Sequence, residues 1–174
     1  SLSRNRNLSA RAWRAKRLRP MARPTFRFRV TSRTGRGQAR AAASTGSAMV
    51  AEIAGIPEGR YSGEGYVYYD GRHEGTKFTI RVDIEVSERR IRFDYSRTDA
   101  QTNGFVNGTF TSSASATILT LLQMINPDIP HNEGCIAHIE VIAPLGTVCH
   151  AAYPASTSSA TIVPSDAMQE AVNK

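Results

Sequence analysis

The chain has 174 residues, of which 40% are hydrophobic and 21% are charged, enough for one domain with a hydrophobic core and too apolar for a wholly disordered chain. No apolar run approaches the roughly 20 residues that a membrane-spanning helix needs, so we expect no membrane segment. The formal net charge of +7 is unevenly distributed: residues 1–51 carry 13 basic side chains and no acidic one, whereas residues 52–174 carry 9 basic and 15 acidic ones.

Residues 1–47 contain all twelve arginines and the one lysine of this basic part. We predict that they form either a disordered, solvated segment or a stretch translated out of frame, because a GC-rich gene read in the wrong frame gives arginine-rich sequence without acids. A third interpretation is a nucleic-acid-binding arm, in which arginines neutralise phosphates and Trp13, Phe26 and Phe28 stack on bases. We favour nucleic acid least as a partner. The remaining residues, 48–174, form the predicted domain.

The first predicted elements of this domain are a short helix and a set of strands. Met49, Ile53 and Ile56 stand at helical spacing, and Gly55 and Pro57 end the pattern. The aromatic stretch "GYVYYD" predicts a short strand. Apolar and polar residues then alternate over residues 78–86 and 91–95. Alternation of this length predicts antiparallel strands with one buried face, joined by a hairpin turn.

The second half of the domain alternates helices with one strand. "TSSASATILTLLQMI" (residues 111–125) predicts a helix that is capped by Thr111 or Ser112 and stops before Pro127. A hairpin-like turn at residues 132–134 leads into a strand within "CIAHIEVIAP", and "PSDAMQEAVNK" predicts a last helix capped by Ser165. We therefore expect an α+β fold, with an antiparallel β-hairpin or sheet on which one long helix and a C-terminal helix pack. The predicted core comprises Ile80, Val82, Ile84, Phe93, Ile118, Leu122, Ile139 and Val141.

Residues that could carry chemistry gather in "NPDIPHNEGCIAHIEVIAPLGTV", residues 126–148. The spacing of His131, Glu133, Cys135 and His138 does not fit the patterns of structural zinc sites, so we expect no bound metal. Pairing of Cys135 with a histidine is a weak signal for a thiol nucleophile. The chain has no G-x-x-x-x-G-K-[ST] or G-x-G-x-x-G pattern, so we expect no cofactor-binding site. The weak candidates for catalytic residues are Asp94, Asp99, His131, Asn132, Glu133 and Cys135.

The two cysteines, Cys135 and Cys149, lie beside apolar segments and form no C-x-x-C pair. This usage is typical of reduced thiols that act as small core residues. It favours a cytoplasmic location.

Residues 56–174 resemble the C-terminal part of the hydantoinase B/oxoprolinase family, which includes the large subunits of acetone and acetophenone carboxylases. "IPEGRY" is similar to the I/L-P-D/E-G-x-Y turn of that family, and "RIRFDYSRTD" to its run ending in D-F-T-G-T/S. The stretch of residues 126–148 resembles N/D-P-D-I-P-x-N-x-G-C-x-x-P-I-x-V-x-x-P-x-G-S/T, and "YPAST" followed by "SDAMQEAV" resembles a Pro-Ala segment before a helix. Departures are Arg97 for glycine, His138 for proline and His150 for asparagine.

The resemblance implies a B-type subunit that works beside a hydantoinase A-type subunit. In such complexes the A-type subunit uses ATP to phosphorylate the substrate, and the B-type subunit completes the opening of a cyclic amide, or a carboxylation in the carboxylase branch. The resemblance also implies that the divalent metal is bound outside this region, because the family's N-terminal Asn-Asp-Pro and histidine-rich segments have no counterpart here. We therefore expect a C-terminal fragment that is inactive alone, with a homo-oligomer as a further possibility. An alternative is a structural or assembly module derived from the family.

Overall fold

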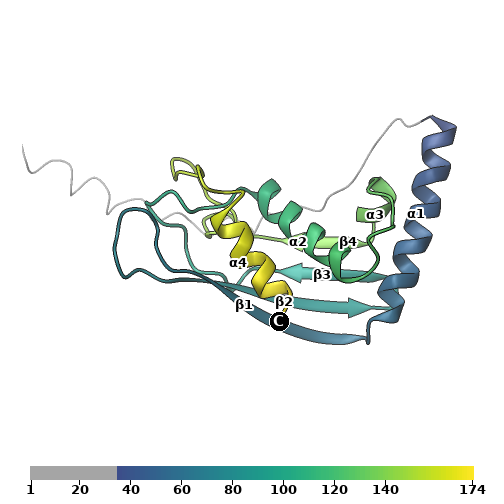
Figure 1. Cartoon of the computed structure of the whole chain (residues 1–174), viewed down its shortest axis with the longest axis horizontal. Coiled ribbons are helices and arrows are strands. Elements are labelled where there is room, and N and C mark those ends of the chain that lie inside the picture. Colours follow the sequence, from purple (N-terminus) through teal and green to yellow (C-terminus); the bar gives the residue numbers. More distant parts are fainter. Residues whose placement is uncertain (1–34) are drawn as a thin grey trace, which may run out of the picture.

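The computed structural model describes residues 35–174, and Figure 1 shows its helices arranged around one sheet. Four strands lie in the order β1 (Gly59–Val67), β2 (Phe78–Ser87), β3 (Arg90–Asp94) and β4 (Ile139–Ile142). The first three pair antiparallel, whereas β4 pairs parallel to β3. The predicted α+β class with an antiparallel hairpin is thus confirmed. The long connection from residue 95 to residue 138 carries the chain back so that β4 runs in the direction of β3.

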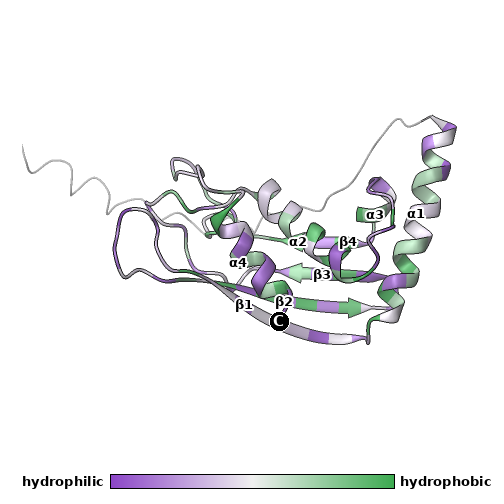
Figure 2. Ribbon diagram, viewed as in Figure 1, coloured by the Kyte–Doolittle hydropathy of each residue, from purple (hydrophilic) through white to green (hydrophobic). Residues whose placement is uncertain are grey.

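The sheet has one apolar face and one polar face, as the alternation in the sequence predicts. Figure 2 shows hydrophobic and hydrophilic residues alternating along β2. The cross-strand register puts Ile84 opposite Phe93 and Val86 opposite Ile91, so these apolar side chains share one face. Of the predicted core residues, Ile80, Val82, Phe93, Leu122, Ile139 and Val141 are buried, and Ile84 and Ile118 are partly buried against the same core.

Two helices cover this apolar face. Helix α2 (Phe110–Met124) begins at Thr109, whose hydroxyl accepts a hydrogen bond from the Ser112 N–H in a capping box. The cap therefore lies two residues before Thr111, and Ser112 forms the other half of the capping box. Helix α4 (Val163–Val172) begins after Ile162. Ser165 does not cap it; its hydroxyl donates to the Ala160 carbonyl.

Helix α1 (Arg36–Gly55) lies at one end of the sheet and packs on the short helix α3 (Glu133–Ile136). The predicted boundary between residues 47 and 48 falls inside α1, since the helix begins at Arg36. The predicted hairpin-like turn at residues 132–134 is instead the start of α3, because Asn132 caps that helix. Among the described residues, no helix is both long and apolar enough to cross a membrane. The predictions for residues 1–34, including the nucleic-acid arm, lie outside the described part of the chain.

Candidate functional site

The structure divides the predicted site residues between two places. Asp94 and Asp99 lie on or beside the polar face of the sheet, within the network of side chains around β2. His131, Asn132, Glu133 and Cys135 lie in or just before α3, which packs on α1. The two groups are therefore not brought together in one site.

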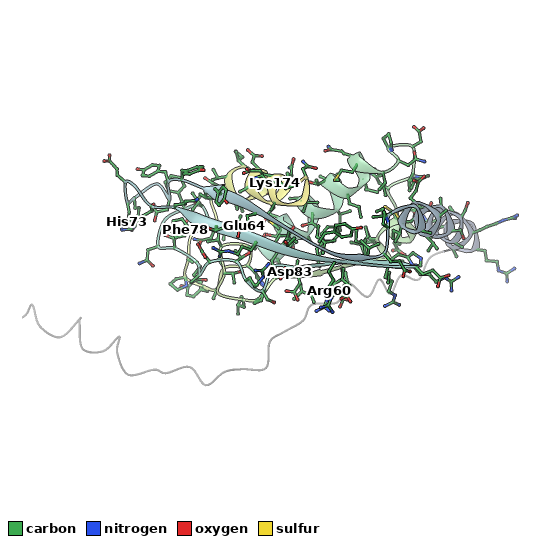
Figure 3. The ribbon with its side chains drawn as sticks, turned by 90° about the horizontal axis from the view of Figure 1, so that it is seen from below. Arg60, Glu64, His73, Phe78, Asp83 and Lys174 are labelled. Atoms are coloured by element: carbon green, nitrogen blue, oxygen red, sulfur yellow. The ribbon has the colours of Figure 1, made fainter. Side chains whose placement is uncertain are left out.

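On the polar face, carboxylates and guanidinium groups alternate across neighbouring strands. Arg81 of β2 contacts Glu64 of β1 at 3.1 Å and Asp99 at 2.8 Å. Asp83 accepts a 2.7 Å hydrogen bond from Arg97. Figure 3 shows Arg60, Glu64 and Asp83 along the first two strands. This arrangement follows from the period of two, which puts the polar residues of adjacent strands side by side.

A further part of this face surrounds Arg92 of β3. Its guanidinium contacts Asp94 at 3.2 Å and Glu85 at 3.6 Å, and these residues line a shallow hollow of about 390 Å³ together with Arg60 and Asp83. Asp94 also accepts a hydrogen bond from the Ser96 N–H. Asp94 is therefore occupied by two donors from its own strand and the loop that follows.

Pairing with Arg97 makes Asp83 unsuitable as a general acid. The hydrogen bond that Arg97 donates lowers the pKa of Asp83, and the hydrogen bond that Arg81 donates to Asp99 raises the pKa of Arg81. A general acid must be protonated near the working pH, and a carboxylate whose pKa is lowered does not meet that requirement.

The residues around α3 have mainly structural contacts. The Asn132 side chain accepts a hydrogen bond from the Gly134 N–H at 2.9 Å and donates one to the Thr45 hydroxyl of α1 at 2.8 Å. Cys135 is fully buried, and burial raises the pKa of its thiol, so it lacks the thiolate character of a nucleophile. Glu133 lines an open groove of about 740 Å³ between α1, α3 and the β2–β3 turn, and His131 is exposed.

The second cysteine has the same character. Cys149 is fully buried, and this burial raises the pKa of its thiol to about 12. Both thiols are free. Across residues 35–174, no group of three or more histidine, cysteine, aspartate or glutamate side chains has the arrangement needed to hold a metal ion.

A buried polar cluster around Asp70 is a feature that sequence reasoning missed. One carboxylate oxygen of Asp70 accepts the N–H groups of Arg72 and His73, and the other accepts the Thr102 hydroxyl at 2.6 Å and faces the His73 imidazole at 2.8 Å. The hydrogen bonds from Thr102 and His73 lower the pKa of Asp70. Figure 3 places His73 at the end of the molecule remote from α1. An Asp-Gly pair is common in exposed turns, so nothing in the sequence indicates that Asp70 is buried.

Comparison with known proteins identifies the family of this chain and several similar proteins. The family model of hydantoinase B/oxoprolinase matches residues 35–174. The chain is 24% identical over 103 residues to a 5-oxoprolinase of Dictyostelium discoideum, a match that covers 59% of this chain and 8% of that protein. It is 29% identical over 126 residues to the caprolactamase subunit beta of Pseudomonas jessenii, covering 71% and 21%.

A solved structure adds the three-dimensional comparison. The crystal structure of the ATP-dependent caprolactamase from Pseudomonas jessenii superposes with a TM-score of 0.67 and 26% identity, over 80% of this chain and 25% of that chain. This chain thus spans from under a tenth to about a quarter of the length of these relatives. The match begins at residue 35, where the described structure also begins. The chain belongs to the hydantoinase B/oxoprolinase family.

Proposed function

We propose that this chain is the C-terminal part of the B-type subunit of an ATP-dependent cyclic-amide hydrolase of the hydantoinase or 5-oxoprolinase type, and that it is inactive alone. The observation that carries the proposal is the family match over residues 35–174 together with the small share of each relative that the match covers. The ketone carboxylase branch of the family is the alternative for the reaction.

The chemistry of the described residues supports a scaffolding role within such an enzyme. Carboxylates of the polar face are paired with arginines, and the buried thiols have raised pKa values. Asp83, whose pKa is lowered, is not suited to donate a proton at neutral pH, and the two buried thiols are not suited to attack a ring carbonyl. In this proposal an A-type partner handles ATP, and the divalent metal is held by residues outside this region.

The first experiment tests whether the chain has activity of its own. The purified chain is incubated with MgATP and, in turn, 5-oxoproline, hydantoin and caprolactam, and ring opening and ADP release are measured. We expect neither product above the rate without protein. Turnover by the chain alone would contradict the proposal that it is an incomplete enzyme.

The second experiment tests the role within a complete enzyme. Residues 35–174 replace the matching segment of the caprolactamase subunit beta of Pseudomonas jessenii, and the hybrid is produced with the rest of that enzyme. We expect measurable ATP-dependent hydrolysis of caprolactam. The control is the same subunit with the segment deleted, which should be inactive. A hybrid that assembles fully but shows no ATP-dependent hydrolysis would count against the family role.

A further inference from the structure

Strand β1 lies at the edge of the sheet, and other parts of the chain cover only half of its outer edge. Among the described residues its only strand neighbour is β2, and Figure 1 shows β1 at the rim of the sheet. Alternate residues of an antiparallel strand direct their main-chain N–H and C=O groups to opposite sides, so an edge strand leaves half of these groups outside the ladder.

Helix α4 covers one half of this edge. The Lys174 ammonium donates to the Glu64 carbonyl at 3.1 Å, and the Tyr66 N–H donates to the Glu170 carboxylate. Figure 3 shows Lys174 at α4 near Glu64. These contacts show that the even-numbered residues of β1 direct their main-chain groups outward. The outward groups of Arg60 and Ser62 are thus part of the same edge.

The other half of the edge is open. Gly63 and Gly65 are buried against the backbone of α4, whereas the strand from Gly59 to Ser62 is exposed. This exposed half contains no proline and no lysine, the residues that commonly prevent pairing at an edge. The strand therefore offers a template for a further strand.

We propose that β1 pairs antiparallel with β1 of a second copy of this chain, about a twofold axis at Ser62. The positions of the charged residues in β1 are the reason for proposing a second copy of this chain as the partner. With the axis at Ser62, Arg60 stands opposite Glu64 of the second copy, and by symmetry the same pair forms twice.

Neighbouring registers lack this complementarity. An axis at Tyr61 sets Glu64 opposite Glu58, and an axis at Glu64 sets Glu64 opposite itself. An axis at Gly63 sets Arg60 opposite Tyr66, so the charges are not matched. Like charges that face each other across a strand pair are destabilising. Among the registers centred on Tyr61 to Glu64, only the one centred on Ser62 pairs opposite charges. A register centred on Gly59 would also set Arg60 opposite Glu58, but it would pair only the first residues of β1, which begins at Gly59.

The side chains involved are accessible for this pairing. The Arg60 side chain is 83% exposed, and its contact with Glu85 is long, at 3.7 Å. Glu64 is 47% exposed and already contacts Arg81, so an incoming Arg60 would extend that ion-pair network. The main-chain groups of Arg60, Ser62 and Glu64 would exchange hydrogen bonds with the second copy. Lys174 would leave the Glu64 carbonyl and keep its ion pair with Glu170.

A charge-swap experiment on the full chain tests the interface by analytical ultracentrifugation over a concentration series. We expect the wild type to form a dimer, and Arg60→Glu and Glu64→Arg each to weaken it roughly tenfold, because each substitution acts twice in a symmetric dimer. The double variant R60E/E64R should recover the wild-type dimerisation constant. Within one chain this swap is unfavourable, because it places like charges beside Glu85 and Arg81. Recovery of the dimerisation constant would therefore report the contact between the two copies.

Three further variants complete the test. Ser62→Pro removes an outward N–H without touching the pairing with β2 and should abolish the dimer. Lys174→Ala removes the competing donor and should not weaken it. Arg36→Glu, a charge reversal on distant α1, is the matched control and should leave it unchanged. A chain that stays monomeric at every concentration, a dimer indifferent to Ser62→Pro, or a double variant weaker than both single variants would overturn the proposal.

Discussion

Asn107 shows how one buried side chain holds several loops together. Its amide nitrogen donates to the carbonyl groups of Thr102, Gly104 and Ser156, and its amide oxygen accepts the Thr102 N–H at 2.8 Å. Replacement by alanine leaves these main-chain groups buried without partners. We expect Asn107→Ala to lower the free energy of unfolding by more than about 2 kcal/mol in urea denaturation. A loss below about 0.5 kcal/mol would show that water replaces the amide without cost.

The limits of sequence reasoning are clearest at single residues. Asn107 and Asp70 look like ordinary loop residues, because asparagine and aspartate favour turns whether exposed or buried. Their burial depends on loops that are distant in the chain and meet only in the fold. Conversely, Cys135 and Asn132 were identified by residue type, yet one is a core residue and the other a helix cap. Residue type indicates possible chemistry, whereas the fold decides which groups meet.

At the scale of elements, prediction succeeds where periodicity is strong. The β2–β3 hairpin follows from strict alternation, which only a strand with one buried face explains. The first part of α1 escaped prediction because its buried face uses Thr45 and Gly46 in place of large apolar residues. Gly46 packs against Gly134 of α3, so this part of α1 is buried without the large apolar side chains that a helical pattern in the sequence would show. The parallel pairing of β4 with β3 could not be predicted either, because the direction in which a long connection returns to the sheet leaves no local pattern in the sequence.

The packing of α2 on the sheet gives a prediction at this scale. Leu122 of α2 is 4% exposed and belongs to the hydrophobic core cluster. We expect Leu122→Ala to lower the free energy of unfolding by about 2–5 kcal/mol. The exposed Leu119 on the same helix provides the control, and Leu119→Ala should cost less than about 1 kcal/mol. Equal effects at both positions would mean that α2 does not pack on the sheet as described.

The contact of α4 with β1 depends on glycine. A Cβ atom at Gly65 would overlap the Ala167 carbonyl oxygen, whereas one at Gly37 on α1 would meet no atom within 4 Å. We expect Gly65→Ala to destabilise the protein by about 1–3 kcal/mol, because α4 must move away from the strand. Gly37→Ala should stabilise it by about 0.4–1 kcal/mol, because alanine loses less backbone entropy in a helix. Thermal unfolding followed by circular dichroism measures both changes, and a neutral Gly65→Ala would contradict the close packing.

The response of the whole molecule to acid follows from its ionised carboxylates. In the folded chain the pKa of Asp70 is lowered from its usual value of 3.8, chiefly by the hydrogen bond from Thr102, and that of Asp83 is lowered by Arg97. The unfolded chain therefore binds more protons at low pH, so these carboxylates stabilise the fold fully above their usual pKa and less as the pH falls below it. Asp83 is half exposed, so its share is the smaller one.

A pH series of urea denaturation tests this account. We expect the free energy of unfolding to fall between about pH 5 and pH 2. Asp70→Asn should destabilise the protein at neutral pH, because the amide cannot accept all the donors that face the carboxylate, and its deficit relative to the wild type should shrink as the pH falls. Glu74→Gln, at an exposed position of the same loop, is the matched control and should follow the wild type. A deficit of Asp70→Asn that stays constant down to about pH 2 would show that the Asp70 cluster does not depend on the ionised carboxylate.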